Sequence, residues 1–316
     1  MTYAMFKYTL KRILILIPVL WGVVTITFII MYVVPGDPVL VLAGERYDEK
    51  TLVEMRRDLG LDKPLHMQYL DYLGRVVRLD LGRSFVTRRP VAASIAERFP
   101  KTLVLAASAM VLAVVIGVSI GGLAVYNRFA WLGNSLMTLS LIGVSIPVFW
   151  LGLLLINIFS VRLSLLPPSG YGGGSLAHLL LPALTLSFAS MATVARVTRS
   201  GFIDAAGEDF IRTARAKGMG EIVIIGKHAF RNALIPVITI VGTDFGSYLS
   251  GSVLTESIFG WPGLGRLIVQ SIMKRDFPVI QGAVLFMAVV FVVVNLLVDL
   301  CYGIIDPRVR VGSGRK

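Results

Sequence analysis

The sequence predicts an all-α polytopic membrane protein with six transmembrane helices. A helical extracytoplasmic insertion is expected after the first span, and a cytoplasmic helix between the fourth and fifth. The 316 residues are 55% hydrophobic and only 16% charged, whereas soluble domains are about 45–50% apolar and about 25% charged. The apolar residues also gather in blocks of about 20, the length that crosses about 30 Å of hydrocarbon as an α-helix. A membrane protein is the only broad class that fits.

The first apolar block, residues 13–34, follows Lys7, Lys11 and Arg12, as the core of a signal peptide would. It is longer than the 7–15 residues of such a core, and no small-residue cleavage site ends it. We therefore expect it to remain as the first span, within an N-terminal region 1–34.

Five further blocks lie in a transmembrane core, residues 102–316. Their expected limits are about 102–126, 136–161 (interrupted by Pro147), 179–195 (with Pro182 near its start), 233–255 and 278–300. Small residues recur four positions apart in two of them, as Ala113, Gly117 and Gly121 and as Gly242 and Gly246. Because this spacing lets helices approach closely in lipid, we expect these spans to pack against other helices.

Basic residues set the expected orientation. They gather in the loop 196–231 and after the last span, whereas the connection between the third and fourth spans carries only Arg162. Since short cytoplasmic loops are rich in Lys and Arg, both termini and the loop 196–231 are predicted to be cytoplasmic. Contact of these cations with membrane lipid explains the net charge of +12. Nucleic-acid binding is not expected, because no basic helix is interleaved with exposed aromatic residues.

The segment 35–101 is predicted to form a helical cap on the extracytoplasmic face. Asp48 can cap a first helix, which Gly60 would end and which has Leu52, Met55 and Leu59 on one face. A second amphipathic stretch contains Tyr69, Leu70, Leu73, Val76 and Val77. Pro90 opens a third that runs to Phe99. The cap either shields the bundle or forms a docking surface for a partner that delivers a solute, and we favour docking.

The loop 196–231 contains a short amphipathic pattern. Its small and apolar residues recur at helical spacing: Gly207, Phe210, Ile211, Ala214 and Gly218. Glu208 precedes Arg212 by four positions, the favourable order for a helical ion pair, and Gly218 with Gly220 supplies a stop. The stripe has no evident partner within its own loop. Because it is made of small residues rather than bulky ones, it favours contact with a protein over contact with lipid.

The stretch 208–218, together with Arg231-Asn232-Ala233-Leu234-Ile235-Pro236, resembles the coupling-loop signature of ABC importer permeases. More narrowly, the chain resembles the first permease subunit of the dipeptide/oligopeptide/nickel family. Further matching motifs run along the chain: Pro35-Gly36-Asp37-Pro38, Leu59-Gly60-Leu61-Asp62-Lys63-Pro64, Asp80-Leu81-Gly82-Arg83-Ser84, Thr255-Glu256-Ser257-Ile258-Phe259, Trp261-Pro262-Gly263-Leu264-Gly265 and Asp306-Pro307-Arg308. The general importer signature opens with Glu-Ala-Ala, where this chain has Arg212-Thr213-Ala214, and its closing proline is displaced to Pro236. Both departures are features of the peptide-type branch.

The resemblance implies a permease subunit in a bacterial inner (cytoplasmic) membrane. It would form a heterodimer with a second homologous permease, two cytoplasmic ATPase subunits would grip the coupling helices, and a periplasmic solute-binding protein would deliver the cargo. Peptides are the expected cargo, with glutathione or a nickel chelate as alternatives. The chain has no phosphate-binding loop, so ATP and Mg are expected on the ATPase subunits. No catalytic residue, metal or cofactor is expected in this chain.

The resemblance also assigns residues. Those expected to couple to the ATPases are Glu208, Asp209, Arg212, Thr213, Ala214, Arg215, Ala216, Lys217 and Gly218. Those expected to meet the binding protein are Asp80, Arg83, Trp261 and Gly263.

Asp244 is the only acid well inside a predicted span. Two roles are open for it: lining the translocation path, where it would meet a peptide amine, or accepting hydrogen bonds from Ser and Thr on neighbouring helices. Asn157 is a second candidate for the path, although its place near a span end also suits helix packing. One acid is too few for the proton relay of an ion-coupled secondary transporter. A membrane enzyme is also disfavoured, because the three histidines fall in separate regions: His66, His178 and His228.

Overall fold

The computed structural model describes residues 3–33, 39, 48–58, 60–126, 135, 138, 145–220 and 230–305. Within these residues the secondary structure is helical, apart from one isolated antiparallel bridge between Arg83 and Pro90. Their contacts divide the chain into two compact units. The first combines Met1–Thr102 with Pro262–Val292, and the second combines Leu103–Trp261 with Val293–Lys316.

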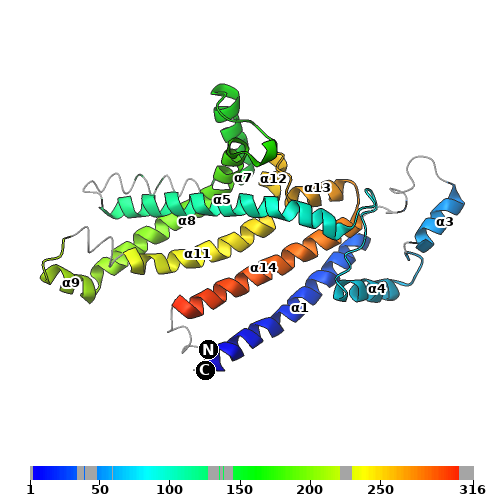
Figure 1. Cartoon of the computed structure of the whole chain (residues 1–316), viewed down its shortest axis with the longest axis horizontal. Coiled ribbons are helices and arrows are strands. Elements are labelled where there is room, and N and C mark those ends of the chain that lie inside the picture. The colour runs from blue at the N-terminus through cyan, green and yellow to red at the C-terminus, as the bar shows by residue number, and fades with distance from the viewer. Residues whose placement is uncertain are drawn as a thin grey trace. The chain divides into compact units, whose positions relative to one another are not determined.

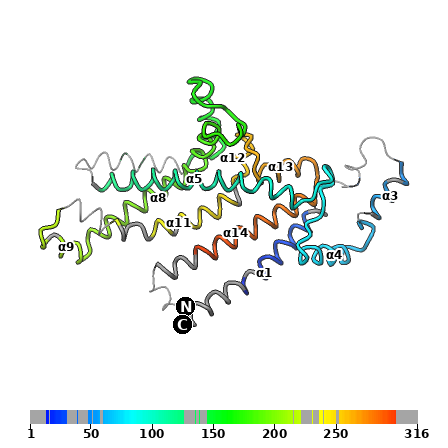
Figure 2. The backbone as a smooth tube through the Cα atoms, in the orientation of Figure 1, coloured from blue at the N-terminus to red at the C-terminus, as the bar shows by residue number. Residues whose placement is uncertain are grey.

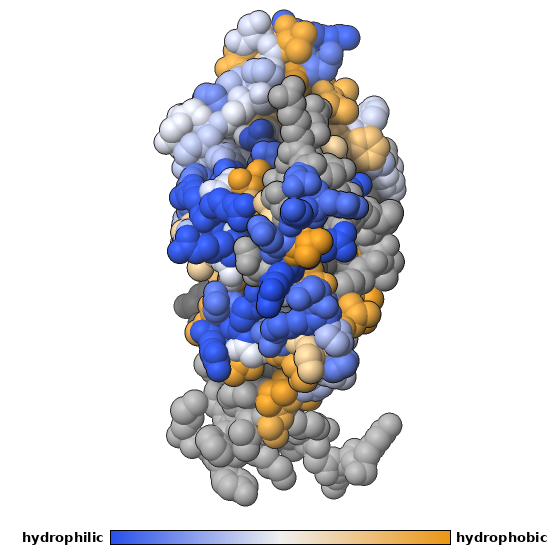
Figure 3. Space-filling view, turned by 90° about the vertical axis from the view of Figure 1, so that its right-hand side faces the viewer, coloured by the Kyte–Doolittle hydropathy of each residue, from blue (hydrophilic) through white to orange (hydrophobic). Residues whose placement is uncertain are grey.

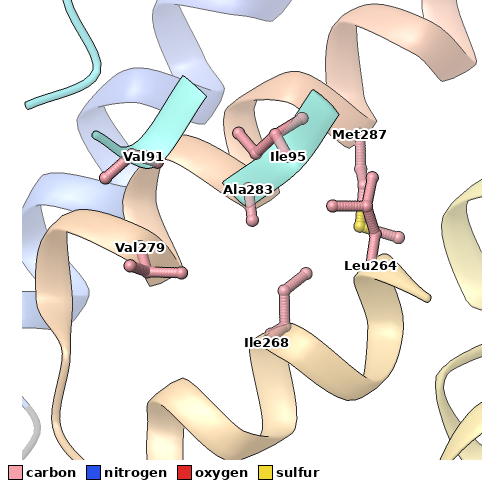
Figure 4. Packing of buried hydrophobic residues seen from close by; sticks show 7 residues of the cluster. All are labelled: Val91, Ile95, Leu264, Ile268, Val279, Ala283 and Met287. Atoms are coloured by element: carbon pink, nitrogen blue, oxygen red, sulfur yellow. The ribbon is translucent and has the colours of Figure 1, made fainter. Parts of the chain in front are cut away.

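Among the described residues, the first unit contains six helices or parts of helices (Figure 1). They are α1 (Tyr3–Val33), α3 (Glu49–Asp58), α4 (Leu65–Val77), the start of α5 (Val91–Tyr126), α13 (Leu264–Met273) and the start of α14 (Phe277–Ile305). A tight apolar cluster joins α5, α13 and α14 (Figure 4): Val91, Ile95, Leu264, Ile268, Val279, Ala283 and Met287. Gly282 permits this approach, because a Cβ there would lie 2.7 Å from Val91.

Helix α4 packs against α1 through aromatic and hydroxyl contacts. Tyr72 is buried with Val24 and Leu285. The hydroxyls of Tyr69 and Thr25 lie 2.7 Å apart, and the ring of Phe28 meets that of Tyr69 edge-on at 5.2 Å. These contacts fix α4 beside residues 24–28 of the first helix.

The second unit is built around two long helices, α8 and α11, that pack side by side (Figure 1). Its elements are the rest of α5, α7 (Val148–Leu155) with its π-helical continuation Ile156–Arg162, a 3₁₀ turn at Gly172–Gly174, α8 (Leu176–Gly207), α9 (Asp209–Ala216), α11 (Phe230–Gly251), α12 (Val253–Ile258) and the end of α14. The small residues predicted to permit close packing do so. A Cβ on Gly117 would lie 2.7 Å from the carbonyl oxygen of Met191, and one on Gly121 2.5 Å from that of Ala195. A side chain on Gly242 would collide with Val298.

Three described helices are long and apolar enough to cross a membrane: Val91–Val125, Leu176–Gly207 and Phe277–Val298. Shorter apolar helices lie at Ile17–Ile30, Val148–Arg162 and Leu264–Met273. Three of the six predicted spans are thus supported by length and composition. Much of the third, residues 136–137 and 139–144, lies outside the described residues, as do the motifs at 35–38 and 306–308.

Two predicted boundaries differ from the observed helices. The amphipathic stretch after Pro90 and the second span form one helix, α5, so the boundary at residue 101 falls inside it despite Pro100. The fourth span was expected to end at residue 195, but α8 continues to Gly207. Polar residues such as Arg196 and Arg199 mark where its apolar character ends, not where the helix ends.

The first two helices predicted for the cap form as α3 and α4, and Gly60 follows α3 with a φ of 67°. Leu59, expected on the apolar face of α3, lies outside the described residues. The apolar face predicted for α4 is wrong in part. Leu70 and Val77 are 62% and 81% exposed, and Tyr72 is the buried residue.

Candidate functional site

Helix α9 forms within the stretch predicted at 208–218. Glu208 is extended (φ −73°, ψ 149°), and its carbonyl oxygen accepts hydrogen bonds from the amides of Ile211 and Arg212. Asp209 in the first turn suits the helix dipole. Gly218 takes a φ of 75° just after the helix, which allows the Met219 amide to bond to the carbonyl oxygen of Ala214.

One expected interaction within α9 is replaced by another. Arg212 approaches Asp209 at 3.6 Å rather than pairing with Glu208. Both side chains of the observed pair are well exposed. Such a pair contributes little to stability, so the helix is held mainly by its packing.

The buried side of α9 packs against the end of α8. Ile211 (1% exposed) and Ala214 (7%) form a cluster with Phe202 and Ala205, and Figure 2 shows α9 folded back against that end of α8. The expectation that the stripe has no partner in its own loop is therefore wrong. The extension of α8 to Gly207, which apolar periodicity did not predict, supplies the partner.

The other side of α9 is exposed among the described residues. Phe210 is 39% exposed. Its neighbours on this side of the helix are exposed as well: Glu208, Asp209, Arg212, Thr213, Ala216, Lys217 and Gly218. The side chain of Arg215 lies outside the described residues. A Cβ on Gly207 would meet nothing within 4 Å. This exposed surface combines one aromatic ring, an exposed glycine and charges of both signs, which suits a protein partner.

Asp244 lies between α11 and α8. The Ser190 hydroxyl donates to the Asp244 carboxylate at 2.5 Å, and Tyr248 lies one turn further along α11 with its side chain buried. The bond shows Asp244 in one of its two predicted roles, as an acceptor for a serine on a neighbouring helix. Its other role, in the translocation path, stays a prediction. Asn157 is exposed on the π-helical segment.

The residues expected to meet a binding protein divide into exposed and buried pairs. Asp80 and Arg83 are exposed on the turn before α5, where the Asp80 carboxylate accepts a hydrogen bond from the Gly82 amide at 2.9 Å. Trp261 is fully buried in the second unit, with its ring 4.9 Å from that of Tyr171. Gly263 is a buried N-cap of α13. Trp261 and Gly263 thus contact this chain, and a docking surface has to be formed by other residues.

Sequence reasoning missed several buried polar residues. Glu256 is fully buried in α12 and accepts a hydrogen bond from Ser252 at 2.8 Å. Asp276 is buried before α14. A signal was available for Glu256, since an acid four residues after a serine inside a matched motif can be satisfied locally. Among the described residues, no group of three or more His, Cys, Asp or Glu is arranged to hold a metal.

Two titratable groups near α4 are shifted by their surroundings. The Lys63 ammonium, which donates a hydrogen bond to Asp71 at 2.6 Å, lowers the pKa of that carboxyl. Burial raises the pKa of the Tyr72 phenol, against a smaller effect of its hydrogen bond with Thr27. Asp71 therefore lies in an exposed, charged environment beside Lys63, whereas Tyr72 lies on the packed side of α4.

Comparison with known sequences places these features in a family. The pattern described as "Binding-protein-dependent transport system inner membrane component" matches residues 88–311, and the corresponding N-terminal pattern matches residues 5–106. The chain belongs to this family. The resemblance to peptide-type ABC importer permeases is thereby confirmed, and the chain is a multi-pass permease component of a bacterial inner membrane.

Relatives of this permease cover nearly its whole length. It is 46% identical over 306 residues to the glutathione transport system permease protein GsiC of Salmonella typhimurium (strain LT2), covering 97% of this chain and 99% of the relative. It is 45% identical to the protein of the same name from Escherichia coli (strain K12), with the same coverage.

Solved structures share the fold of the permease at low identity. A structure of the MetNI methionine ABC transporter in an inward-facing conformation matches with a TM-score of 0.57 and 18% identity, covering 67% of this chain and 96% of that one. An amino acid ABC transporter solved with histidines matches with a TM-score of 0.51 and 21% identity, covering 66% and 92%. At these identities the likeness supports the fold alone.

Proposed function

We propose that this permease imports small peptides, with glutathione as the first cargo to test. The observation that supports glutathione as the cargo is the 46% identity, over 97% of the chain, to permeases named for glutathione transport. Glutathione is itself a tripeptide, so this cargo falls within the peptide class that the sequence predicts. No phosphate-binding loop occurs in the sequence, so the energy is assigned to two partner ATPases that bind ATP and Mg.

The remaining partners follow from the same family membership. The permease pairs with a second, homologous permease, and a periplasmic solute-binding protein delivers the cargo. Both termini and the loop 196–231 face the cytoplasm, since that loop carries the dense basic residues of a cytoplasmic connection. The segment 35–101 then lies on the periplasmic side, where the exposed Asp80 and Arg83 are available to the binding protein.

The packing of α9 supports a role in coupling. Helix α8 has 32 residues, about 48 Å at 1.5 Å per residue, which exceeds the about 30 Å of hydrocarbon. Its last turns therefore project beyond the membrane, and Ile211 and Ala214 fasten α9 to Phe202 and Ala205 there. An ATPase that held the exposed side of α9 would move α8 directly.

Contacts within the second unit extend this path of motion. Helices α8 and α11 pack along their length, and the bond from Ser190 to Asp244 joins them near the middle of α8. Movement of α8 would reach α11 through this interface. The Asp244 carboxylate has a second oxygen that can accept a hydrogen bond beside the one from Ser190, so its two candidate roles are compatible.

Uptake in cells tests the cargo. The permease, produced with its co-encoded partners in a strain without glutathione importers, should restore uptake of labelled glutathione. Excess unlabelled glutathione should compete, and dipeptides and longer peptides define the breadth of the cargo class. Restored uptake of a dipeptide that glutathione does not inhibit would replace glutathione with that peptide. Absence of peptide uptake of any length would contradict the proposal.

A further inference from the structure

A basic cleft of about 860 Å³ lies beside α4 in the first unit. Its lining includes six basic side chains: Arg57, Lys63, Arg75, Arg78, Arg83 and Arg88. The face that Figure 3 presents is hydrophilic over much of its middle, with apolar residues scattered around it. Arginine forms paired hydrogen bonds with phosphate and carboxylate oxygens, so a cleft dominated by arginine suits an anionic group.

The acids of the cleft leave most of this positive charge unneutralised. Among the described residues that line it, the carboxylates are those of Asp71 and Asp80. Asp71 is paired with Lys63 at 2.6 Å, and Asp80 accepts the Gly82 amide. Neither makes an ion pair with the arginines among the salt bridges of the described residues. Arg75 also helps to lower the pKa of Asp71 through its charge, but two carboxylates against six basic side chains still leave the described lining with a net charge of +4, which favours an anionic ligand.

The depth of α4 indicates which anion would reach the cleft. Tyr69 and Tyr72 fix α4 to Thr25, Thr27 and Phe28 of α1. Helix α1 continues to Val33, about 7 Å beyond Phe28 at 1.5 Å per residue. The Gln281 side-chain amide donates to the Thr27 carbonyl oxygen at 3.4 Å, and Gln281 lies only about 6 Å from the start of the apolar helix Phe277–Val298. Thr27, and α4 beside it, therefore lie near one end of that span, at about the level of the lipid headgroups. Tyrosines are typical of that level.

Exposed apolar side chains accompany the arginines. Leu70 lines the cleft and is 62% exposed. At the end of α4, Val77 is 81% exposed and Leu79 is 86% exposed with a φ of 59°, while the exposed Ile29 lies on α1. Large aliphatic side chains beside arginines suit a ligand that has both a charged headgroup and acyl chains. A helix with both kinds of side chain is typical of a membrane surface.

We propose that the α4 cleft binds the phosphate of an anionic phospholipid. Arg75 and Arg78 hold the headgroup, and the acyl chains lie along the exposed aliphatic side chains of α4 and α1. The site takes a lipid of the leaflet on its own side of the membrane and fixes the 48–90 segment to the bilayer.

Lipid binding by the purified full-length chain tests this proposal. Dioleoyl phosphatidylglycerol and dioleoyl phosphatidylcholine are titrated into the detergent-solubilised protein, and bound lipid is counted by native mass spectrometry. We expect a clear preference for phosphatidylglycerol. Each basic residue near a charged membrane surface contributes about a fivefold change in binding, so the Arg75→Gln/Arg78→Gln variant should bind it about 25-fold more weakly.

Matched variants separate the cleft from general charge. Lys50→Gln/Arg89→Gln removes two positive charges from the same segment outside the cleft lining and should change affinity less than twofold. Arg75→Lys/Arg78→Lys should keep most of it. Leu70→Gln should lower the affinity for phosphatidylglycerol, and millimolar inorganic phosphate should not displace the bound lipid.

The proposal would be overturned if the cleft and control variants lost equal affinity for phosphatidylglycerol, or if Arg75→Gln/Arg78→Gln bound it as the wild type does. Complete displacement by inorganic phosphate would replace the lipid with a free anion. A cleft variant that binds lipid normally but loses a binding-protein partner would assign the cleft to an acidic protein. Photo-crosslinking from position 70 in intact membranes gives an independent readout: a phosphatidylglycerol adduct is expected, and its absence contradicts the proposal even where a variant fails to fold.

Discussion

Ser84 donates its hydroxyl hydrogen to the carboxylate of Asp276 across 2.5 Å, although 192 positions separate the two residues. Both side chains are buried. The amide of Phe85 donates to the other carboxylate oxygen at 2.9 Å, and the amide of Thr87 donates to the Ser84 hydroxyl at 2.8 Å. Asp276 therefore holds the turn before α5 to the turn between α13 and α14.

Removal of this carboxylate should destabilise the first unit. Hydrogen bonds to a charged group contribute about 1.5–3 kcal/mol each, and Asp276→Ala removes two of them, so we expect the free energy of unfolding to fall by about 3–6 kcal/mol. Ser84→Ala should cost about 1–3 kcal/mol. Chemical unfolding of the purified chain measures both. Ser94→Ala, which removes only a long exposed bond, serves as the control. An Asp276→Ala variant as stable as that control would contradict the assignment.

Two adjacent glycines of α5 should respond in opposite directions to the same substitution. A Cβ on Gly121 would lie 2.5 Å from the carbonyl oxygen of Ala195, whereas the nearest atom to one on Gly122 is in the Phe202 ring at 3.7 Å. Gly121→Ala should cost about 1–3 kcal/mol through overpacking. Gly122→Ala should be neutral or gain about 0.5–1 kcal/mol from helix propensity. Thermal unfolding in detergent compares them, and equal effects would show that α5 and α8 do not pack closely at Gly121.

The fold could be predicted from the sequence where apolar length decides the structure. The spans at α5 and α14 and the small-residue contacts of Gly117 and Gly121 follow from composition and spacing. Helix ends beyond the membrane could not be predicted in this way. Helix α8 continues to Gly207 because Phe202 and Ala205 pack against α9, a tertiary contact that apolar periodicity within one segment does not contain.

Burial in the candidate sites was predictable only in part. The helix at α9 follows from its spacing and its glycine stop, but its buried side could not be assigned before its partner was known. Trp261 stands in one of the motifs that carry the family resemblance and was expected at a surface, yet it is fully buried with its ring edge-on to that of Tyr171. Long-range pairs such as Ser84 with Asp276 leave no periodic signal, since neither residue belongs to a repeating pattern.

Gly207 offers the sharpest test of coupling through α9. It borders the exposed side of the helix, and a Cβ there would have no described atom within 4 Å. Gly207→Trp should therefore leave folding intact while it blocks an ATPase partner, with at least tenfold less transport. Gly218 is less suitable, because its φ of 75° makes any bulky substitution strained. Gly218→Asn, which tolerates that conformation, is the control and should keep most activity. Normal ATPase stimulation in Gly207→Trp would exclude this surface.

The pair of Lys63 and Asp71 should make the turn before α4 sensitive to acid. Because Lys63 lowers the pKa of Asp71 in the folded chain, the pair stabilises the turn above the usual aspartate pKa of about 3.9. That contribution is lost as the pH falls through the lowered pKa. Hydrogen-exchange protection factors at residues 60–63, which are corrected for the intrinsic rate at each pH, should fall below about pH 4 in the wild type. In Lys63→Met the protection factors should already be lower at neutral pH and change less on acidification. An identical pH response in both proteins would contradict this role.

Transport in reconstituted proteoliposomes tests most directly whether this permease depends on partner ATPases. The permease, its co-encoded permease partner and their ATPases are placed in proteoliposomes with the solute-binding protein and labelled glutathione. We predict accumulation that requires ATP on the ATPase side and every subunit, and that is lost in Gly207→Trp. Accumulation driven by an ion gradient without ATP, or by this chain alone, would contradict the account of a permease subunit that depends on partner ATPases.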